Sequence, residues 1–250
     1  MGWCEMSLVI LLTLPAMAAP PSEHRPVDEL SWTPLNPARG DASPRAADLW
    51  GERDTAGPAG FLVRFADGFA SPPHVHNVSY RAVVLEGRVH NDDPTAAPMW
   101  MAPGSFWTQP RGEAHITSAT GVSIAYVEID SGPYLVAPAD QAEDHGERPV
   151  NVDTTNLVWR GDGVQTADLW GRPGSGTGGM MIRFGPAHPA TLSSAAPLRA
   201  VVVRGQVAGE TAGSLLSGKE VPLTCTADPC WVYVRGESGI SVRPATSPGP

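Results

Sequence analysis

The stretch SPPHVHNVSYRAVVLEG, residues 71–87, decides the fold because it joins an H-x-H pair to an apolar strand. Successive side chains of a β-strand point to opposite faces, so His74 and His76 share a face. Tyr80 has the same parity and joins that face if no bulge intervenes. The stretch therefore predicts two imidazoles held side by side, with a phenol near them.

A third histidine, His115, follows in PGSFWTQPRGEAHIT, residues 103–117, where Gly104, Pro110 and Gly112 place turns before a new strand. A single histidine is more often a hydrogen-bonded core residue than a ligand. Three imidazoles from two strands, however, suit Zn, Fe, Ni or Cu and leave coordination positions open for water or substrate. The pattern predicts a metal site formed by His74, His76 and His115.

The composition favours an all-β protein. The chain has 250 residues, 42% of them hydrophobic, which is enough for a core in one large or two small domains. Glycine (27) and proline (26) are frequent, and no segment sustains an apolar period of 3.6 residues. Short β-rich runs separated by turn residues are typical of a sandwich or barrel, and they lie at residues 60–66, 79–85, 104–108, 115–118 and 122–129.

The charge pattern argues against nucleic-acid binding. The formal net charge is −9, and no cluster of lysine or arginine occurs. A nucleic-acid-binding surface needs such a basic patch to neutralise phosphates. We therefore expect a small-molecule partner.

The sequence repeats itself. AADLWGERDTAGPAGFLVRF (46–65) matches TADLWGRPGSGTGGMMIRF (166–184), YRAVVLEGRV (80–89) matches LRAVVVRGQV (198–207), and AYVEIDSG (125–132) matches VYVRGESG (232–239). Two copies of one module, each of normal domain size, are predicted. Their expected bounds are 44–139 and 153–244, with a polar linker at 140–152 and a loose tail at 245–250.

The N-terminus reads as an export signal at residues 1–18. An apolar run, too short to span a bilayer, precedes the A-x-A cleavage site Ala16-Met17-Ala18. Translation starts at Met1 or Met6, and the alternative reading is an apolar strand or helix. The signal predicts a periplasmic or secreted protein that has no membrane attachment after cleavage. A poorly ordered Pro-rich lead-in, 19–43, is expected to follow and to end as an edge strand around 30–33.

Removal of residues 1–18 leaves two cysteines, Cys225 and Cys230, in CTADPC. An even pair in an exported protein predicts a disulfide that closes a small loop between two strands. The alternative is two free thiols.

The histidine motifs resemble those of the cupins. The first cupin motif, G-x5-H-x-H-x3,4-E-x6-G, is matched by Gly68, His74, His76 and Gly87, and Tyr80 stands at its glutamate position. The second, G-x5-P-x-G-x2-H-x3-N, is matched by Gly104, Pro110, Gly112 and His115, and Ala119 stands at its asparagine position. The resemblance implies jelly-roll barrels and a metal on the three histidines.

The second copy departs from these motifs. The segment ATLSSAAPLRAVV, residues 190–202, offers Thr191, Ser193 and Ser194 where the first copy has imidazoles. His188 lies nearby but is alone. The resemblance thus implies a bicupin, in which the N-terminal copy binds metal and the degenerate C-terminal copy is its packing partner.

The resemblance extends to function. The sequence of residues 45–135 is similar to those of an uncharacterised bacterial cupin group related to zinc-binding anti-sigma-factor cupins. Three-His cupins with iron include thiol dioxygenases and a diketone-cleaving dioxygenase. A site without the glutamate keeps the full charge of its metal and favours anionic, chelating ligands. Fe or Zn is the expected metal, with Mn and Ni as alternatives, and family habit implies a homodimer.

The sequence therefore predicts an exported oxygenase that acts on a small oxygenated molecule. In this reading Tyr80 orients the substrate, and Glu128, if it points inward, is a general base. One alternative is a non-catalytic cupin that binds or senses a metal or a small ligand. Another is a zinc or manganese isomerase or hydrolase, because the same three imidazoles serve all of these functions.

Overall fold

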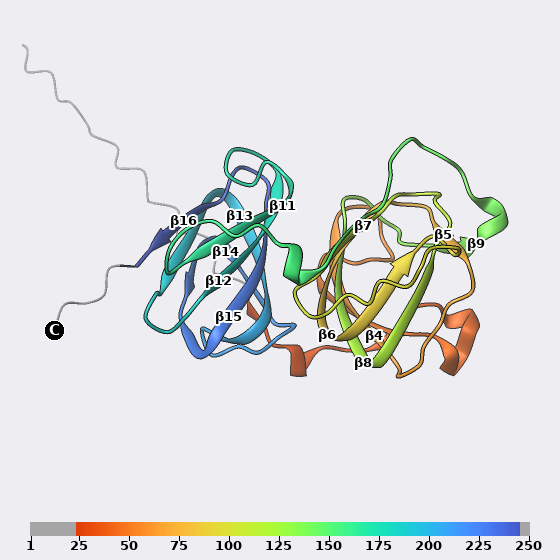
Figure 1. The fold of residues 1–250 in the computed structure, drawn as a ribbon, viewed down its shortest axis with the longest axis horizontal. Coiled ribbons are helices and arrows are strands. Elements are labelled where there is room, and N and C mark those ends of the chain that lie inside the picture. Colours follow the sequence, from red (N-terminus) through yellow and green to blue (C-terminus); the bar gives the residue numbers. More distant parts are fainter. Residues whose placement is uncertain (1–23, 246–250) are drawn as a thin grey trace, which may run out of the picture.

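The computed structural model describes residues 24–245, which form two β-barrels side by side (Figure 1). The all-β class and the tandem arrangement are confirmed. The predicted signal peptide, residues 1–18, lies outside the described residues. Within the described range no helix is both long and apolar enough to cross a membrane.

The N-terminal barrel consists of a seven-stranded sheet in the order β10-β7-β6-β8-β4-β3-β2 and a two-stranded sheet, β5-β9. Its two longest strands, β6 and β8, pair along their whole length in antiparallel register. The bounds are β2 (Thr33–Pro34), β3 (Arg45–Trp50), β4 (Ala59–Phe65), β5 (His74–His76), β6 (Tyr80–Asp92), β7 (Phe106–Gln109), β8 (Ile116–Ile129), β9 (Val136–Pro138) and β10 (Val150–Val152).

The C-terminal barrel repeats this plan with the order β1-β14-β13-β15-β12-β11, and β16 also pairs with β13. A disulfide joins Cys225 and Cys230, as predicted, but both cysteines lie in β15 rather than on two strands. The bounds are β1 (His24–Arg25), β11 (Gln165–Gly171), β12 (Gly178–Phe184), β13 (Ala190–Val207), β14 (Leu215–Leu223), β15 (Cys225–Gly236) and β16 (Ser241–Pro244).

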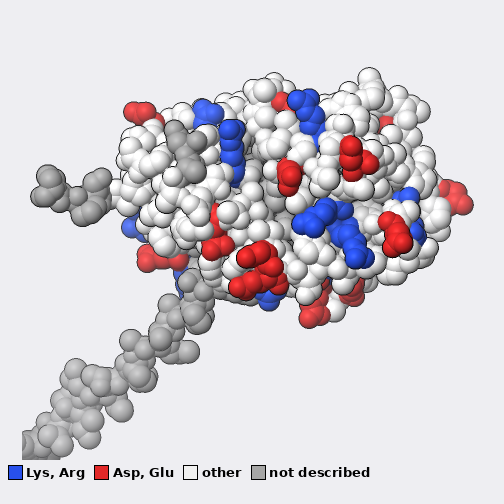
Figure 2. Space-filling model, turned by 90° about the horizontal axis from the view of Figure 1, so that it is seen from below, with Lys and Arg blue, Asp and Glu red and all other residues white. Residues whose placement is uncertain are grey.

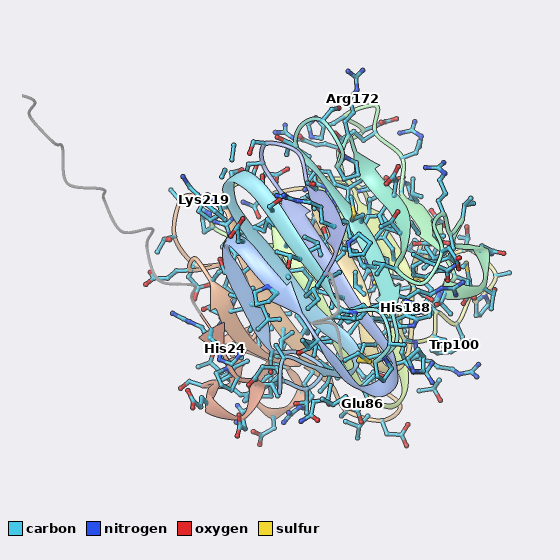
Figure 3. The ribbon with its side chains drawn as sticks, turned by 90° about the vertical axis from the view of Figure 1, so that its left-hand side faces the viewer. His24, Glu86, Trp100, Arg172, His188 and Lys219 are labelled. Atoms are coloured by element: carbon cyan, nitrogen blue, oxygen red, sulfur yellow. A yellow bond between two sulfur atoms is a disulfide. The ribbon has the colours of Figure 1, made fainter. Side chains whose placement is uncertain are left out.

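The lead-in differs from the expectation, because residues 24–43 dock on both barrels. β1 pairs with β14 of the C-terminal barrel, the amide of Val27 donates to Ser214 Oγ (3.1 Å), and β2 pairs with β3 of the N-terminal barrel. Two 3₁₀ turns, η1 (Val27–Glu29) and η2 (Pro37–Ala42), lie along this strap, which crosses from one barrel to the other in red and orange in Figure 1. In Figure 3, His24 lies at its start.

The predicted linker also contains structure. It begins in η3 (Ala139–Gln141), and its last residues form β10, which pairs with β7. The sheet of the N-terminal barrel therefore extends to Val152 rather than ending at residue 139. One more 3₁₀ turn, η4 (Thr154–Asn156), leads into the C-terminal barrel.

Three apolar clusters hold the molecule together, one inside each barrel and one between the barrels. Alternating side chains of β8 belong to two of these clusters. Val127 packs inside the N-terminal barrel, whereas Tyr126 packs against the C-terminal barrel. At this end of β8 both faces are thus removed from water, and both contribute hydrophobic stabilisation.

Repeated residues make the interface between the barrels nearly symmetric. Trp50 Nε1 donates to Tyr126 OH (3.0 Å), and its counterpart Trp170 Nε1 donates to Tyr233 OH (2.8 Å). Each indole is also covered by an arginine from the other barrel: Arg199 lies 4.0 Å from the ring of Trp50, and Arg81 lies 3.8 Å from that of Trp170. Gly60 and Gly179 lie under the two indoles, where a Cβ atom would overlap the ring.

Charged side chains of both signs are interspersed on the face of the molecule shown in Figure 2.

Candidate metal centre

The three predicted histidines meet at one place in the N-terminal barrel. His74 and His76 lie on the short strand β5, which pairs with β9 at the end of this barrel remote from the C-terminal barrel (Figure 1). The backbones of His74 and His115 exchange two hydrogen bonds of 3.0 Å, which hold β5 against the start of β8. The parity argument from the sequence is confirmed, since both side chains of β5 reach His115.

The imidazole rings are close enough to share one ion. Ring centroids are 4.2 Å apart for His74 and His115, 5.0 Å for His74 and His76, and 5.1 Å for His76 and His115. One nitrogen from each ring lies within 4.8 Å of the others, and no second cluster of metal-ligating side chains occurs among residues 24–245. His76 and His115 are almost fully buried, whereas His74 is partly exposed.

Backbone carbonyls fix the orientation of all three rings. The Nδ1 atom of each imidazole bonds a carbonyl oxygen: His74 bonds Pro72 (2.9 Å), His76 bonds Leu135 (3.1 Å) and His115 bonds Glu113 (3.1 Å). A carbonyl only accepts, so each Nδ1 carries the proton and each Nε2 keeps a lone pair. Metal-binding histidines are commonly oriented in this way, so the donor set fits a divalent transition metal.

The site also keeps the rings neutral. Burial, together with the neighbouring His74, lowers the pKa of His115 to about 3. Burial and the two neighbouring imidazoles hold the pKa of His76 well below its ordinary value. The pKa of His74 is lowered mainly by burial and also by the charge of Arg39. Neutral imidazole is the form that binds a metal.

Tyr80 occupies the place predicted for it. Its hydroxyl donates to Asn91 Oδ1 (3.1 Å) and lies 3.5 Å from His115 Nε2. Asn91 in turn donates to Gln109, and Gln109 donates to the carbonyl of Glu113 that orients His115. Burial raises the pKa of Tyr80, so the phenol is neutral and remains a hydrogen-bond donor.

A second tyrosine, Tyr134, was not identified from the sequence. Its ring stacks on His76 at a centroid distance of 4.5 Å, and its hydroxyl lies 3.2 Å from His76 Nε2. Asn77 holds the tyrosine's backbone in place by bonding the carbonyl of Pro133 (2.9 Å) and the amide of Leu135 (2.8 Å). Tyr134 follows the last repeated strand and belongs to no motif, so only its packing identifies it.

A cavity of about 330 Å³ is lined by His74 and His76, whereas His115 is buried and is not part of its wall. Its wall is mostly apolar and comes from β4, β5, β6, β9 and, unexpectedly, the N-terminal strap. The strap contributes Leu35, Asn36 and Arg39, and Pro44 follows directly after it. Trp107 lies in the wall with an indole N–H that is buried and has no hydrogen-bond partner among the described atoms. The volume is at the small end of the range for ligand pockets.

The prediction that Glu128 is a general base at the metal is wrong, because its side chain faces the other barrel. Its carboxylate accepts hydrogen bonds from Tyr126 OH (3.0 Å) and Tyr233 OH (2.7 Å) and lies 3.5 Å from Arg235 Nη1. It is fully buried there and does not line the cavity. Arg235 stands at the equivalent place in the second copy, so opposite charges at matched repeat positions were the sequence signal for this pair.

The interior of the C-terminal barrel is apolar. Leu192 on β13 belongs to its core, between Thr191 and Ser193, where the resemblance implied no ligands. His188 is exposed on this barrel and is seen at its surface in Figure 3. The metal-ligating group is therefore in the N-terminal barrel alone among the described residues.

The lowered histidine pKa values predict how the metal-free protein responds to acid. A group whose pKa is lowered by folding contributes stability above its unfolded pKa and loses it as the pH falls. The free energy of unfolding should therefore decrease from about pH 6.5 towards pH 3, by about 1.4 kcal/mol per pH unit for each histidine that stays neutral. Urea unfolding at successive pH values measures this slope. His115→Gln should reduce it, and an unchanged slope would contradict the assignment.

Comparison with solved structures supports the fold. A protein from Nostoc punctiforme described as a "putative dioxygenase" superposes with a TM-score of 0.66 at 14% identity, covering 90% of this chain and 87% of that one. Oxalate decarboxylase from Lactobacillus farciminis gives 0.55 at 9% identity, covering 90% and 88%. Oxalate decarboxylase from Bacillus subtilis, a protein described with Mn(II) centres, gives 0.56 at 11%, covering 88% and 78%.

No curated protein matches the chain in sequence. A family model described as a domain of unknown function, DUF4437, matches residues 23–215, which span most of both barrels and include all three histidines. The chain therefore belongs to the DUF4437 family, and its fold is that of a bicupin.

Proposed function

We propose that this protein is a metal-dependent oxygenase that acts on a small oxygenated organic molecule in the N-terminal barrel. The observation that supports it best is the cluster of three neutral, carbonyl-oriented imidazoles, two of which, His74 and His76, line a mostly apolar cavity. The resemblance to three-His dioxygenases points the same way, as does the similarity to a protein described as a "putative dioxygenase".

His74, His76 and His115 would hold the ion through Nε2. When bound, the metal would supply Lewis-acid or redox chemistry at positions that the protein leaves open. The protein's own side chains orient the substrate. Tyr80 and Tyr134 place two hydroxyls beside the imidazoles. The apolar wall excludes water, which strengthens these interactions.

For the metal we propose iron or zinc, with manganese and nickel as the next choices. Imidazole nitrogen is a good ligand for all of these, and a site without a carboxylate does not reduce the ion's charge. Iron would match oxygenase chemistry, and zinc would match the resemblance to zinc-binding anti-sigma-factor cupins. We also propose export to the periplasm or medium, on the basis of the signal-like residues 1–18.

Elemental analysis combined with oxygen uptake tests the proposal. Protein purified from its native compartment should contain about one metal ion per chain. Iron-loaded protein should consume oxygen when given a diketone, a thiol or a catechol, and His76→Ala protein should not. One zinc per chain with no turnover of any substrate would instead favour a non-catalytic binding protein.

A further inference from the structure

One charged side chain in the cavity wall is not used by the proposed function. Arg39 belongs to η2 of the N-terminal strap and lines the same cavity as His74 and His76. The other lining residues include no aspartate, glutamate or lysine. The cavity therefore combines a mostly apolar wall, the neutral imidazoles of His74 and His76 and a single guanidinium.

The surroundings of Arg39 hold its guanidinium in place without neutralising it. The group lies 5.7 Å from the ring centroid of Phe69, which also lines the cavity. Among the described residues Arg39 forms no ion pair, whereas Arg53, Arg81 and Arg235, for example, do. It is also half-buried, so its charge is less screened than that of a surface arginine.

The strap is well placed to hold this residue. η2 lies between β2, which pairs with β3, and Pro44, which accepts a hydrogen bond from the amide of Leu35 (2.7 Å). Ser43 Oγ accepts from the amide of Asn36 (2.8 Å), and Asn36 Oδ1 accepts from the amide of Ala38 (3.1 Å). Both ends of the turn are thus closed by hydrogen bonds, and Arg39 projects from a fixed segment.

We propose that Arg39 binds the carboxylate of the substrate and that the substrate is a small, mostly apolar carboxylic acid. The inference rests on the proposed function for the role of the metal. A guanidinium presents paired N–H donors that match a carboxylate, and such charge-assisted bonds are strong where water is excluded. The apolar wall accepts the rest of the molecule, and the small volume limits its size. A phosphate group would need more donors than this single arginine provides.

Calorimetry on zinc-loaded protein with matched probes tests the proposal. Phenylacetate and 4-methylpentanoate are each compared with their own amide, which keeps the shape and removes the charge. The variants are Arg39→Gln and Arg39→Lys. The control is Arg172→Gln, which removes the same charge from an exposed site on the C-terminal barrel (Figure 3). Circular dichroism and zinc content check that each variant folds and binds metal.

We expect the wild type to bind at least one carboxylate ten times more tightly than its amide. Arg39→Gln should weaken carboxylate binding by about ten- to hundredfold and leave amide binding within about threefold. The carboxylate affinity of Arg39→Lys should lie between those of the wild type and Arg39→Gln. The carboxylate affinity of Arg172→Gln should match that of the wild type. The proposal is overturned if Arg39→Gln keeps the carboxylate affinity of the wild type, or if neither carboxylate binds more tightly than its amide. Tighter binding of phenyl phosphate than of phenylacetate would also overturn it.

Failure of the proposed function would look different. In that case the wild type binds no metal, or binds metal without consuming oxygen, and neither result depends on Arg39. The same probes are then titrated into the metal-free protein, where loss of carboxylate preference in Arg39→Gln still supports the role of Arg39 and an unchanged preference still overturns it.

Discussion

His115→Ala is expected to abolish stoichiometric metal binding, with a loss of affinity of more than about 100-fold. Even residues that only orient a metal ligand contribute about 10–100-fold to affinity, and His115 is a proposed ligand itself. It is also the residue that connects β5 to β8, because its backbone bonds that of His74. Metal content by elemental analysis after dialysis against a weak chelator measures the effect.

His188→Ala is the matched control for this experiment, since His188 is exposed on the C-terminal barrel and does not line the cavity. It should keep the metal content of the wild type. His115→Gln provides a second variant that preserves side-chain volume and polarity if the alanine variant unfolds. One equivalent of tightly bound metal in either His115 variant would show that the ligands are assigned incorrectly.

Glu128→Ala is expected to destabilise the protein by about 3–5 kcal/mol without removing its metal. The substitution leaves a buried arginine with one carboxylate fewer and leaves two buried hydroxyls, those of Tyr126 and Tyr233, without their acceptor. Removing one partner of a buried ion pair typically costs this much. Arg235 keeps contacts with Asp130 (2.8 Å) and Glu237 (2.8 Å), which place the expected cost towards the lower end. Urea unfolding measures it.

Glu128→Gln separates the structural role from a catalytic one. The amide oxygen still accepts a hydrogen bond, so the loss of stability should be smaller than in Glu128→Ala. Metal content and oxygen uptake per metal ion should match the wild type, because the carboxylate faces the other barrel. If Glu128→Gln kept its stability but lost turnover, the carboxylate would be acting at the metal after all.

The motif residues of the site were predictable because they depend on local rules. Strand parity places His74 and His76 on one face, and turn residues place His115 at the start of a strand. Tyr80 begins the next strand, β6, and its hydroxyl reaches the same site. Glu128 is a residue whose direction strand parity does not predict. Alternation tells which residues share a face, but the end of β8, residues 125–129, is buried on both faces, so its apolar run does not reveal which face lines the barrel.

Tyr134 and Arg39 required the tertiary structure for another reason. Each lies in an irregular segment, and neither segment has a period or motif that indicates its direction. Their places are set by long-range contacts, through Asn77 in one case and the β2–β3 pairing in the other.

The sequence by itself determined the all-β class, the duplication, the disulfide and the three imidazoles that meet in the first copy, because repeats, parity and turn residues are local properties. Only the tertiary structure decided what surrounds those imidazoles. The packing of the two barrels buries Glu128 between them. The N-terminal strap, which pairs with both barrels, forms part of the cavity wall. Such contacts between residues far apart in the chain leave no periodic pattern in the sequence.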